Sequence, residues 1–436
     1  MNRFLFSWLI IIAILTSVLY HTFKGLLKTK RQKVPLLCIF ISTFIYSGIG
    51  ICYEKVNKVY LIYYIIFLAS IAITYTFLVT NNTRILLNTN RKYKFRCIDD
   101  VNFWSSKNTK MIFKYVVCLY VGLRILSLIY PVNRLSNFSL VFNSENNLAN
   151  LNGTNASFIG VISTWIQPLY LIGLYYVCTK VKQVAFFLGL DQFVTLITTG
   201  YLSRYRIIVI IIICLFLFFN DDLNDKYISL SKKRKRIVFS LLILMPIVIY
   251  VMLAMMELRI SGSATFTISD LITSEIGYPL QYDKIFCMAP ISTASDFFLQ
   301  LLDSFVPIIP TPIYHMDLNV DFSIRYLGYG LDVSWFSVML PSVLGESVLI
   351  FGKYLFWIHG IVIGCLCALI YKVVRENKCV VILFYHYLTC ILTTGRAGYE
   401  QLSQSILLNY VFLVGGIYII RRISYRFKYR RRIQDE

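Results

Sequence analysis

The feature that most constrains this chain is a series of continuous apolar runs, most of them close to membrane-spanning length. A helix of roughly 20 apolar residues crosses the hydrocarbon core of a bilayer. Lipid offers backbone groups no hydrogen-bond partner, so only helices and closed barrels span it, and a barrel would show shorter, alternating segments. Because the runs are continuous and 57% of all residues are hydrophobic, we expect an all-α, polytopic helical membrane protein.

The runs predict about 11 transmembrane helices, with a range of 10–12 because two of the runs are short. The predicted spans are 4–20, 34–52, 59–79, 111–130, 158–178, 184–199, 206–220, 237–256, 348–371, 379–393 and 402–420. We expect a single membrane domain over residues 1–436. One large polar loop, residues 257–347, interrupts it on one side of the bilayer.

Positive charge sets the expected orientation, because Lys and Arg stay on the cytoplasmic side of short loops. The basic clusters lie at 28–33, 91–96, 232–236 and 421–432. With eleven spans, all four fall on one face, which makes the C-terminus cytoplasmic and the N-terminus external. The external loops are then 131–157, 200–205, 257–347 and 394–401.

The same topology accounts for most of the formal net charge of +21. The basic residues show little of the aromatic interleaving of a nucleic-acid surface, so we expect no nucleic-acid partner. The 11 cysteines are scattered through the spans. They predict neither a disulfide framework nor a paired CxxC metal site.

Arg124 and Asp191 fall inside predicted spans, where a charge is costly unless it is paired or lies in a wet cavity. A mutual structural ion pair is the favoured interpretation of these two residues. A GxxxG pattern at Gly360 and Gly364 predicts a helix-packing face in the ninth span.

Several arginines fall on the predicted external face, where the positive-inside bias disfavours them. They are Arg204, Arg206, Arg259, Arg325 and Arg396. Arginine presents a planar, permanently charged fork that matches phosphate oxygens. These residues are therefore candidate phosphate ligands. The alternative for each is an interfacial arginine paired with a lipid phosphate or a nearby carboxylate.

Two residues are candidate general bases. Glu346 lies in a polar turn at the mouth of the ninth predicted span, where neighbours can tune a carboxylate to accept a proton. Its alternative role is to cap the next helix, since an acid interacts well with the helix dipole. His315, in a proline-flanked segment, is the second candidate, because histidine titrates near neutral pH.

The segment from residue 309 to 366 resembles a known family. It has a Pro-rich start, the stretch RYLGYG at 325–330, the stretch LGES at 344–347, and Phe351-Gly352 before a helix with Gly360 and Gly364. This segment, and the layout of many spans with one dominant external loop, resemble the O-antigen and oligosaccharide repeat-unit polymerases of bacterial envelopes. The glycine spacings differ from the family's paired Arg-containing loops, so which two arginines correspond stays open.

The resemblance implies a GT-C-like glycosyltransferase in the bacterial inner membrane, acting on undecaprenyl diphosphate-linked oligosaccharides at the periplasmic face. It implies a base near the acceptor hydroxyl and cations near the leaving diphosphate. Glu346 or His315 would be the base, and the external arginines would bind the diphosphate. The expected partners are the lipid-linked oligosaccharide, the bilayer and a chain-length regulator protein; no metal or other cofactor is expected.

Two other functions remain open at this point. An O-antigen ligase, which transfers finished polymer to lipid A, is related to these polymerases and would share much of the layout. A flippase or other transporter would show paired halves with interrupted helices that meet at the midplane. This chain instead concentrates its polar residues in the loop 257–347.

Overall fold

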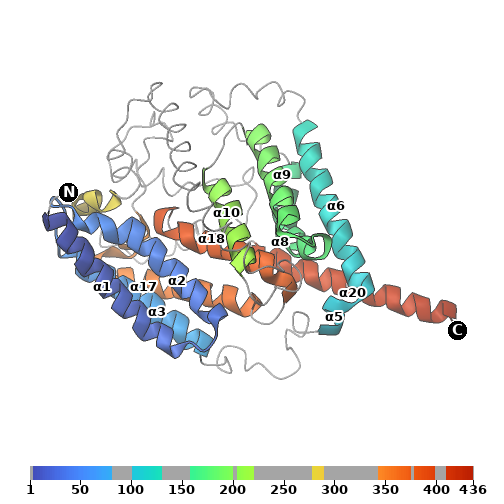
Figure 1. The fold of residues 1–436 in the computed structure, drawn as a ribbon, viewed down its shortest axis with the longest axis horizontal. Helices are drawn as coiled ribbons and strands as arrows, with labels where there is room; N and C mark the ends of the chain where they lie inside the picture. The colour runs from blue at the N-terminus through green and yellow to red at the C-terminus, as the bar shows by residue number, and fades with distance from the viewer. Residues whose placement is uncertain are drawn as a thin grey trace, which may run out of the picture. The chain divides into compact units, whose positions relative to one another are not determined.

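The computed structural model describes residues 3–80, 101–129, 158–199, 204–219, 277–288, 342–374, 378–397 and 409–435. In these ranges the secondary structure is helical and contains no strand (Figure 1). The all-α prediction is therefore confirmed for the described part of the chain.

Four helices in the described ranges are long and apolar enough to cross a membrane. They are Leu5–Leu26, Lys30–Cys52, Tyr60–Thr80 and Phe351–Tyr371. They correspond to the first, second, third and ninth predicted spans, and they support a membrane protein. The count of eleven spans and the GT-C-like architecture stay predictions, and the predicted span 237–256 lies outside the described residues.

The chain divides into two compact units. Unit 1 contains Met1–Lys94, Ile268–Arg375 and Tyr387–Leu408, and unit 2 contains Phe95–Thr267, Glu376–His386 and Asn409–Glu436. Helix α18 (Val381–Ala397) supplies residues to both. The expectation of a single membrane domain stays a prediction.

Unit 1 is built around its first three long helices. These are α1 (Arg3–Leu26), α2 (Lys30–Thr43) and α3 (Tyr60–Thr80). A capping box of Thr29 and Gln32 starts α2. After Thr43 the same helix continues as a π-helical turn, η1 (Phe44–Gly48), and a 3₁₀ turn, η2 (Ile49–Cys52).

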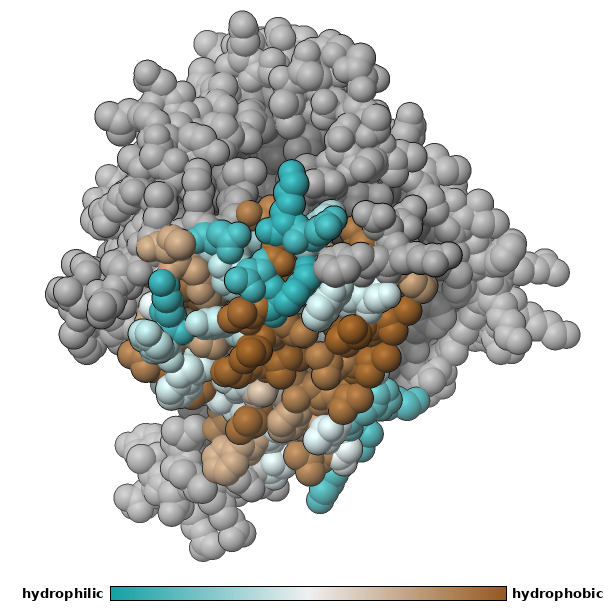
Figure 2. Space-filling model, turned by 90° about the vertical axis from the view of Figure 1, so that its left-hand side faces the viewer, coloured by the Kyte–Doolittle hydropathy of each residue, from teal (hydrophilic) through white to brown (hydrophobic). Residues whose placement is uncertain are grey.

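The outer faces of α1 and α3 are apolar. They expose Phe6, Ile10, Ile14, Val18, Ile62, Ile66, Ile73 and Phe77. Figure 2 shows a face on which apolar side chains form a band with hydrophilic side chains at its margins. Lipid tails solvate such a band, whereas water would not.

Helix α17 (Ser342–Val374) packs on α3 through Gly360 and Gly364. A Cβ atom at Gly360 would lie 3.1 Å from the carbonyl oxygen of Phe67, and one at Gly364 would lie 2.8 Å from that of Ile71. Both contacts advance by four residues in the same direction, so the two helices run parallel. The predicted GxxxG packing face is confirmed.

The start of α17 differs from the expected polar turn. Residues 342–351 are helical, and Gly352 then leaves the helical region with φ 77° and ψ 175°. Ser347 and His359 form a side-chain hydrogen bond of 2.7 Å. A straight helix would separate them by about 18 Å along its axis. The chain therefore folds back at Gly352, and the predicted span 348–371 is broken there.

Unit 2 contains most of the remaining helices. They are α5 (Val101–Ser105), α6 (Lys107–Ile129), α8 (Phe158–Val177), α9 (Val181–Thr199), α10 (Arg204–Phe219), the 3₁₀ turn η9 (Lys378–Val380) and α20 (Asn409–Asp435). Tyr120 of α6 stacks on Tyr170 of α8 with ring centroids 4.0 Å apart. The last predicted span, 402–420, overlaps α20, which continues through the basic tail, and residues 402–408 lie outside the described residues.

Candidate functional site

The structure describes the side chains of two candidate site residues, Glu346 and Arg396. Arg204 and Arg206 lie in the first turn of α10, but their side chains are outside the described set. His315, Arg259 and Arg325 lie outside the described residues, as does most of the loop 257–347. The structure therefore bears on Glu346 and Arg396, and the others stay predictions.

The short helix 342–351 carries Glu346, whose side chain is buried with 8% exposure. At the start of this helix, Ser342 is fully buried and has φ 60°. A residue other than glycine pays about 1–2 kcal/mol for this left-handed conformation. Two hydrogen bonds hold Ser342 there, from Ser47 of η1 at 3.2 Å and with the hydroxyl of Tyr282 at 2.8 Å.

Tyr282 belongs to a short helical piece of the large loop. The 3₁₀ turn η6 (Tyr278–Gln281) leads into α14 (Tyr282–Met288). Burial raises the pKa of Tyr282 to about 12, so its hydroxyl stays neutral at physiological pH. Phe286 of α14 packs on the ring of Tyr60 at 4.6 Å, and the hydroxyl of Tyr60 donates to Asp283 at 2.5 Å. These contacts fix α14 against the start of α3.

Arg396 lies in the last turn of α18, which α2 holds in place. The hydroxyl of Ser42 donates to the carbonyl of Leu392 at 2.6 Å and accepts from the N–H of Gly395 at 2.8 Å. A Cβ atom at position 395 would lie 2.5 Å from the carbonyl oxygen of Ser42. The backbones approach so closely that only glycine fits at position 395.

One segment of α2 and η1 therefore supports both described candidate residues. Ser42 fixes the turn that carries Arg396, and Ser47 fixes the start of the helix that carries Glu346. Five residues of helix advance by about 7–8 Å along its axis. Between the two serines the helix changes to π-helical geometry, a distortion that is frequent at functional sites. We take this serine-bearing segment, residues 42–47, with the two helix ends it holds, as the candidate site.

The contacts also show which ends of the unit 1 helices lie together. The starts of α3 and of residues 342–351 both contact α14 at one end of the bundle, and the end of α18 contacts Ser42, which lies in the middle of the membrane-length helix Lys30–Cys52. At the other end, the hydroxyl of Tyr75 in α3 donates to the carbonyl of Gln32 near the start of α2. The charge pattern places the first group outside the membrane; this side stays a prediction.

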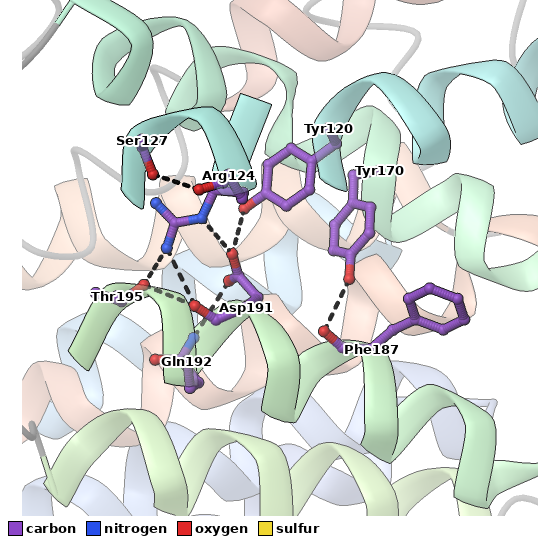
Figure 3. Close-up of polar contacts among 8 residues, drawn as sticks. All are labelled: Tyr120, Arg124, Ser127, Tyr170, Phe187, Asp191, Gln192 and Thr195. Carbon is purple, nitrogen blue, oxygen red and sulfur yellow. Dashed lines mark hydrogen bonds and ion pairs between the residues drawn. The ribbon is translucent and has the colours of Figure 1, made fainter. Parts of the chain in front are cut away.

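Unit 2 has a separate buried polar cluster, which Figure 3 shows in close-up. The Nε atom of Arg124 lies 2.7 Å from a carboxylate oxygen of Asp191, and the hydroxyl of Tyr120 donates to the same oxygen at 2.9 Å. Arg124 also donates to the side chain of Thr195 and to the carbonyl of Asp191. The predicted mutual ion pair is confirmed.

The amide of Gln192 completes this cluster by donating to the second carboxylate oxygen of Asp191 at 3.3 Å. Asp191 is 7% exposed and Arg124 14% exposed, so both charges are largely withdrawn from the solvent. Because opposite charges and several hydrogen bonds compensate this burial, the cluster can join α6 and α9 inside a bilayer.

Sequence reasoning missed the residues that hold the candidate site: Ser42, Ser47, Tyr282, Ser342 and His359. Hydroxyl side chains are common in spans and carry no distinctive local pattern. His359 gave one usable signal, since an ionisable residue in an apolar run is rare without a role.

The described residues contain no group of three or more His, Cys, Asp or Glu side chains that could hold a metal ion. Comparisons with protein-family models, with curated protein sequences and with solved structures each find no match to this chain. The functional interpretation therefore depends on the residues and their geometry.

Proposed function

We propose that this protein is a glycosyltransferase that polymerises undecaprenyl diphosphate-linked oligosaccharide repeat units of a bacterial surface polysaccharide. It would act at the periplasmic face of the inner membrane, with its C-terminus in the cytoplasm. The observation that carries this proposal is the serine-bearing segment 42–47, which holds both the helix with Glu346 and the helix end with Arg396. A carboxylate and a guanidinium on neighbouring supports are the two groups that this reaction needs.

In the proposed reaction, Glu346 takes the proton of a hydroxyl on the incoming lipid-linked unit. The hydroxyl oxygen then bonds to the anomeric carbon of the growing chain, while the bond from that carbon to the lipid diphosphate breaks. The diphosphate leaves with the bonding electrons. Burial of Glu346 favours this role, because few water molecules then compete for its oxygens.

Arginine is suited to the charge that develops on the leaving diphosphate, since preorganised donors at such a position lower a barrier most. Arg396 is the described candidate, and Arg204, Arg206, Arg259 and Arg325 are the others. The side chain of Arg396 is half-buried at the end of α18. The apolar faces of α1 and α3 suit a bilayer, in which the lipid tails of both substrates would remain.

The test is deletion of the gene, followed by size separation of the surface polysaccharide. Loss of a polymerase leaves single repeat units on lipid A, because the ligase and the flippase still act. Complementation with the wild-type gene should restore long chains. A deletion strain with no repeat units on lipid A would instead indicate a ligase or a flippase and would contradict the proposal.

A further inference from the structure

The short helix 342–351 is fixed at both ends and at one point between them. Ser342 anchors its start through Ser47 and Tyr282, and Gly352 with φ 77° forms the turn at its end. The side chains of residues 342–349 are buried, so the direction of each depends on the rotation of the helix about its own axis. Adjacent residues point about 100° apart on a helix, so a modest rotation would turn Glu346 away from its present direction.

A hydrogen bond that opposes such a rotation is made by His359, on the other side of the turn. His359 is 2% exposed, its Nδ1 atom lies 2.7 Å from the hydroxyl of Ser347, and its ring stacks on Phe351 with centroids 5.5 Å apart. Ser347 directly follows Glu346 in the same helix. Fixing the direction of Ser347 therefore fixes the direction of Glu346.

The direction of the hydrogen bond follows from the second contact of Ser347. Its hydroxyl donates to the carbonyl of Val343 at 2.6 Å. A serine hydroxyl has one hydrogen, so in the bond to His359 the serine oxygen accepts. His359 must then carry its proton on Nδ1 and act as the donor.

We infer that His359 is a positioning residue, which holds Glu346 in its reactive direction by donating a hydrogen bond to Ser347 across the fold at Gly352. This inference rests on the proposed function, since it assigns Glu346 a chemical task. It also predicts which substitutions retain function. A replacement must place a donor where Nδ1 lies, and the amide of asparagine does so, whereas that of glutamine reaches the place of Nε2.

The first experiment tests the fold-back without reference to activity. Ser347→Cys with His359→Cys should form a disulfide under mild oxidation in membranes. Trypsin cleaves after Lys353, which lies between the two positions, and the following peptide also carries Cys365 and Cys367; with these two replaced by Ala, the linked peptides identify the bond by mass. Ser347→Cys with Ile363→Cys, one turn further along, is the control that should not link. Absence of the first link, with both cysteines reactive after unfolding, would overturn the inference.

The second experiment measures polysaccharide made by variants that replace the deleted gene, at equal amounts of protein in the membrane. His359→Leu and His359→Gln should lower polymer by about tenfold or more, which is the range for loss of a buried donor. His359→Asn should recover most of it, and Ser347→Ala should lower polymer to the level of His359→Leu. His21→Leu, at an exposed position of α1, is the control that should behave as wild type.

Adding Ser347→Ala to His359→Leu should cause little further loss of polymer, because the two substitutions remove the same hydrogen bond. If His359→Leu does not accumulate, the pair His359→Asn and His359→Gln decides, and equal activity of that pair overturns the positioning role. An inactive Glu346→Gln beside a normal His359→Leu overturns the positioning role alone. A fully active Glu346→Gln overturns the catalytic role of Glu346, and the positioning role fails with it.

Discussion

The two buried polar clusters differ in which groups join the helices. In unit 2 charged groups join the helices, since Arg124 of α6 binds Asp191 of α9. In unit 1 neutral hydroxyls join them, since Ser42, Ser47 and Tyr282 hold the helix ends next to Glu346 and Arg396. Two charges that bind each other stabilise the fold and are not available to bind a substrate. Neutral hydroxyls can hold the helix that carries a charged residue and leave its charge free of an opposite charge from the support.

The comparison predicts its largest effect in unit 2. Arg124→Leu or Asp191→Leu leaves the other charge buried without its partner, which typically costs about 3–5 kcal/mol. We expect each single variant to lose most of its folded protein in detergent, measured by size exclusion and thermal unfolding.

The double variant Arg124→Leu/Asp191→Leu is the matched control, and it should recover much of the loss because no charge remains buried. Single variants that unfold at the wild-type temperature would show that the ion pair does not support unit 2, and the contrast between the units would disappear.

The next effect concerns catalysis in unit 1. Glu346→Gln keeps the size of the side chain but removes the basic group, so polymer formation should fall by about a hundredfold or more while the protein stays folded. Surface polysaccharide at matched protein levels measures this. Glu54→Gln, at an exposed position, should have no effect.

His315→Gln separates the two candidate bases and should be mild. An active Glu346→Gln together with an inactive, well-expressed His315→Gln would transfer the role of base to His315 and leave Glu346 as a helix cap.

A smaller effect is expected at the support of Arg396. Gly395→Ala forces a methyl group against the backbone of Ser42, so the end of α18 must move away from α2. We expect polymer to fall by about tenfold, by analogy with overpacking costs of 1–3 kcal/mol. Gly415→Ala provides the control, because nothing lies within 4 Å of a Cβ atom there. Equal polymer from the two variants would show that this close approach is not required.

The smallest effect belongs to one hydroxyl. Tyr282→Phe removes the hydrogen bond to Ser342 and keeps the ring packing, which should cost about 1 kcal/mol and lower polymer several-fold. Tyr418→Phe, where the side chain is 59% exposed, should not change polymer. If Tyr282→Phe lowered polymer as much as Glu346→Gln, Tyr282 would have a direct role in the reaction. The hydroxyls of unit 1 would then not act only as supports for charged residues.

Part of this organisation could be read from the sequence because it follows from the cost of burial. Apolar runs predict helices in lipid, and paired glycines predict close helix packing. Opposite charges inside apolar spans, such as Arg124 and Asp191, predict an ion pair. Each of these follows from a few residues and the solvent around them, and the described residues confirm the glycine face and the ion pair.

The candidate site was only partly predictable, because its geometry depends on distant contacts. Gly352 lies in a run that has a helical pattern on both sides, and its positive φ is visible only in the fold. The contact of Ser42 with Gly395 joins residues 353 positions apart, and a lone serine gives no sign of its partner. Glu346 could be singled out by its chemistry, but the hydroxyls that support it could not.

The two serines that support the helix ends are made long before their partners during synthesis of the chain. Ser42 and Ser47 are synthesised almost 300 residues before Ser342 and about 350 before Gly395. Until those residues arrive, each serine hydroxyl in lipid has the carbonyl one turn back in its own helix as its available partner. Completion of the fold then exchanges a local hydrogen bond for one to a late segment. Helix α2 can therefore enter the bilayer with its serine hydroxyls hydrogen-bonded, and it becomes a support only when Ser342 and Gly395 have been made.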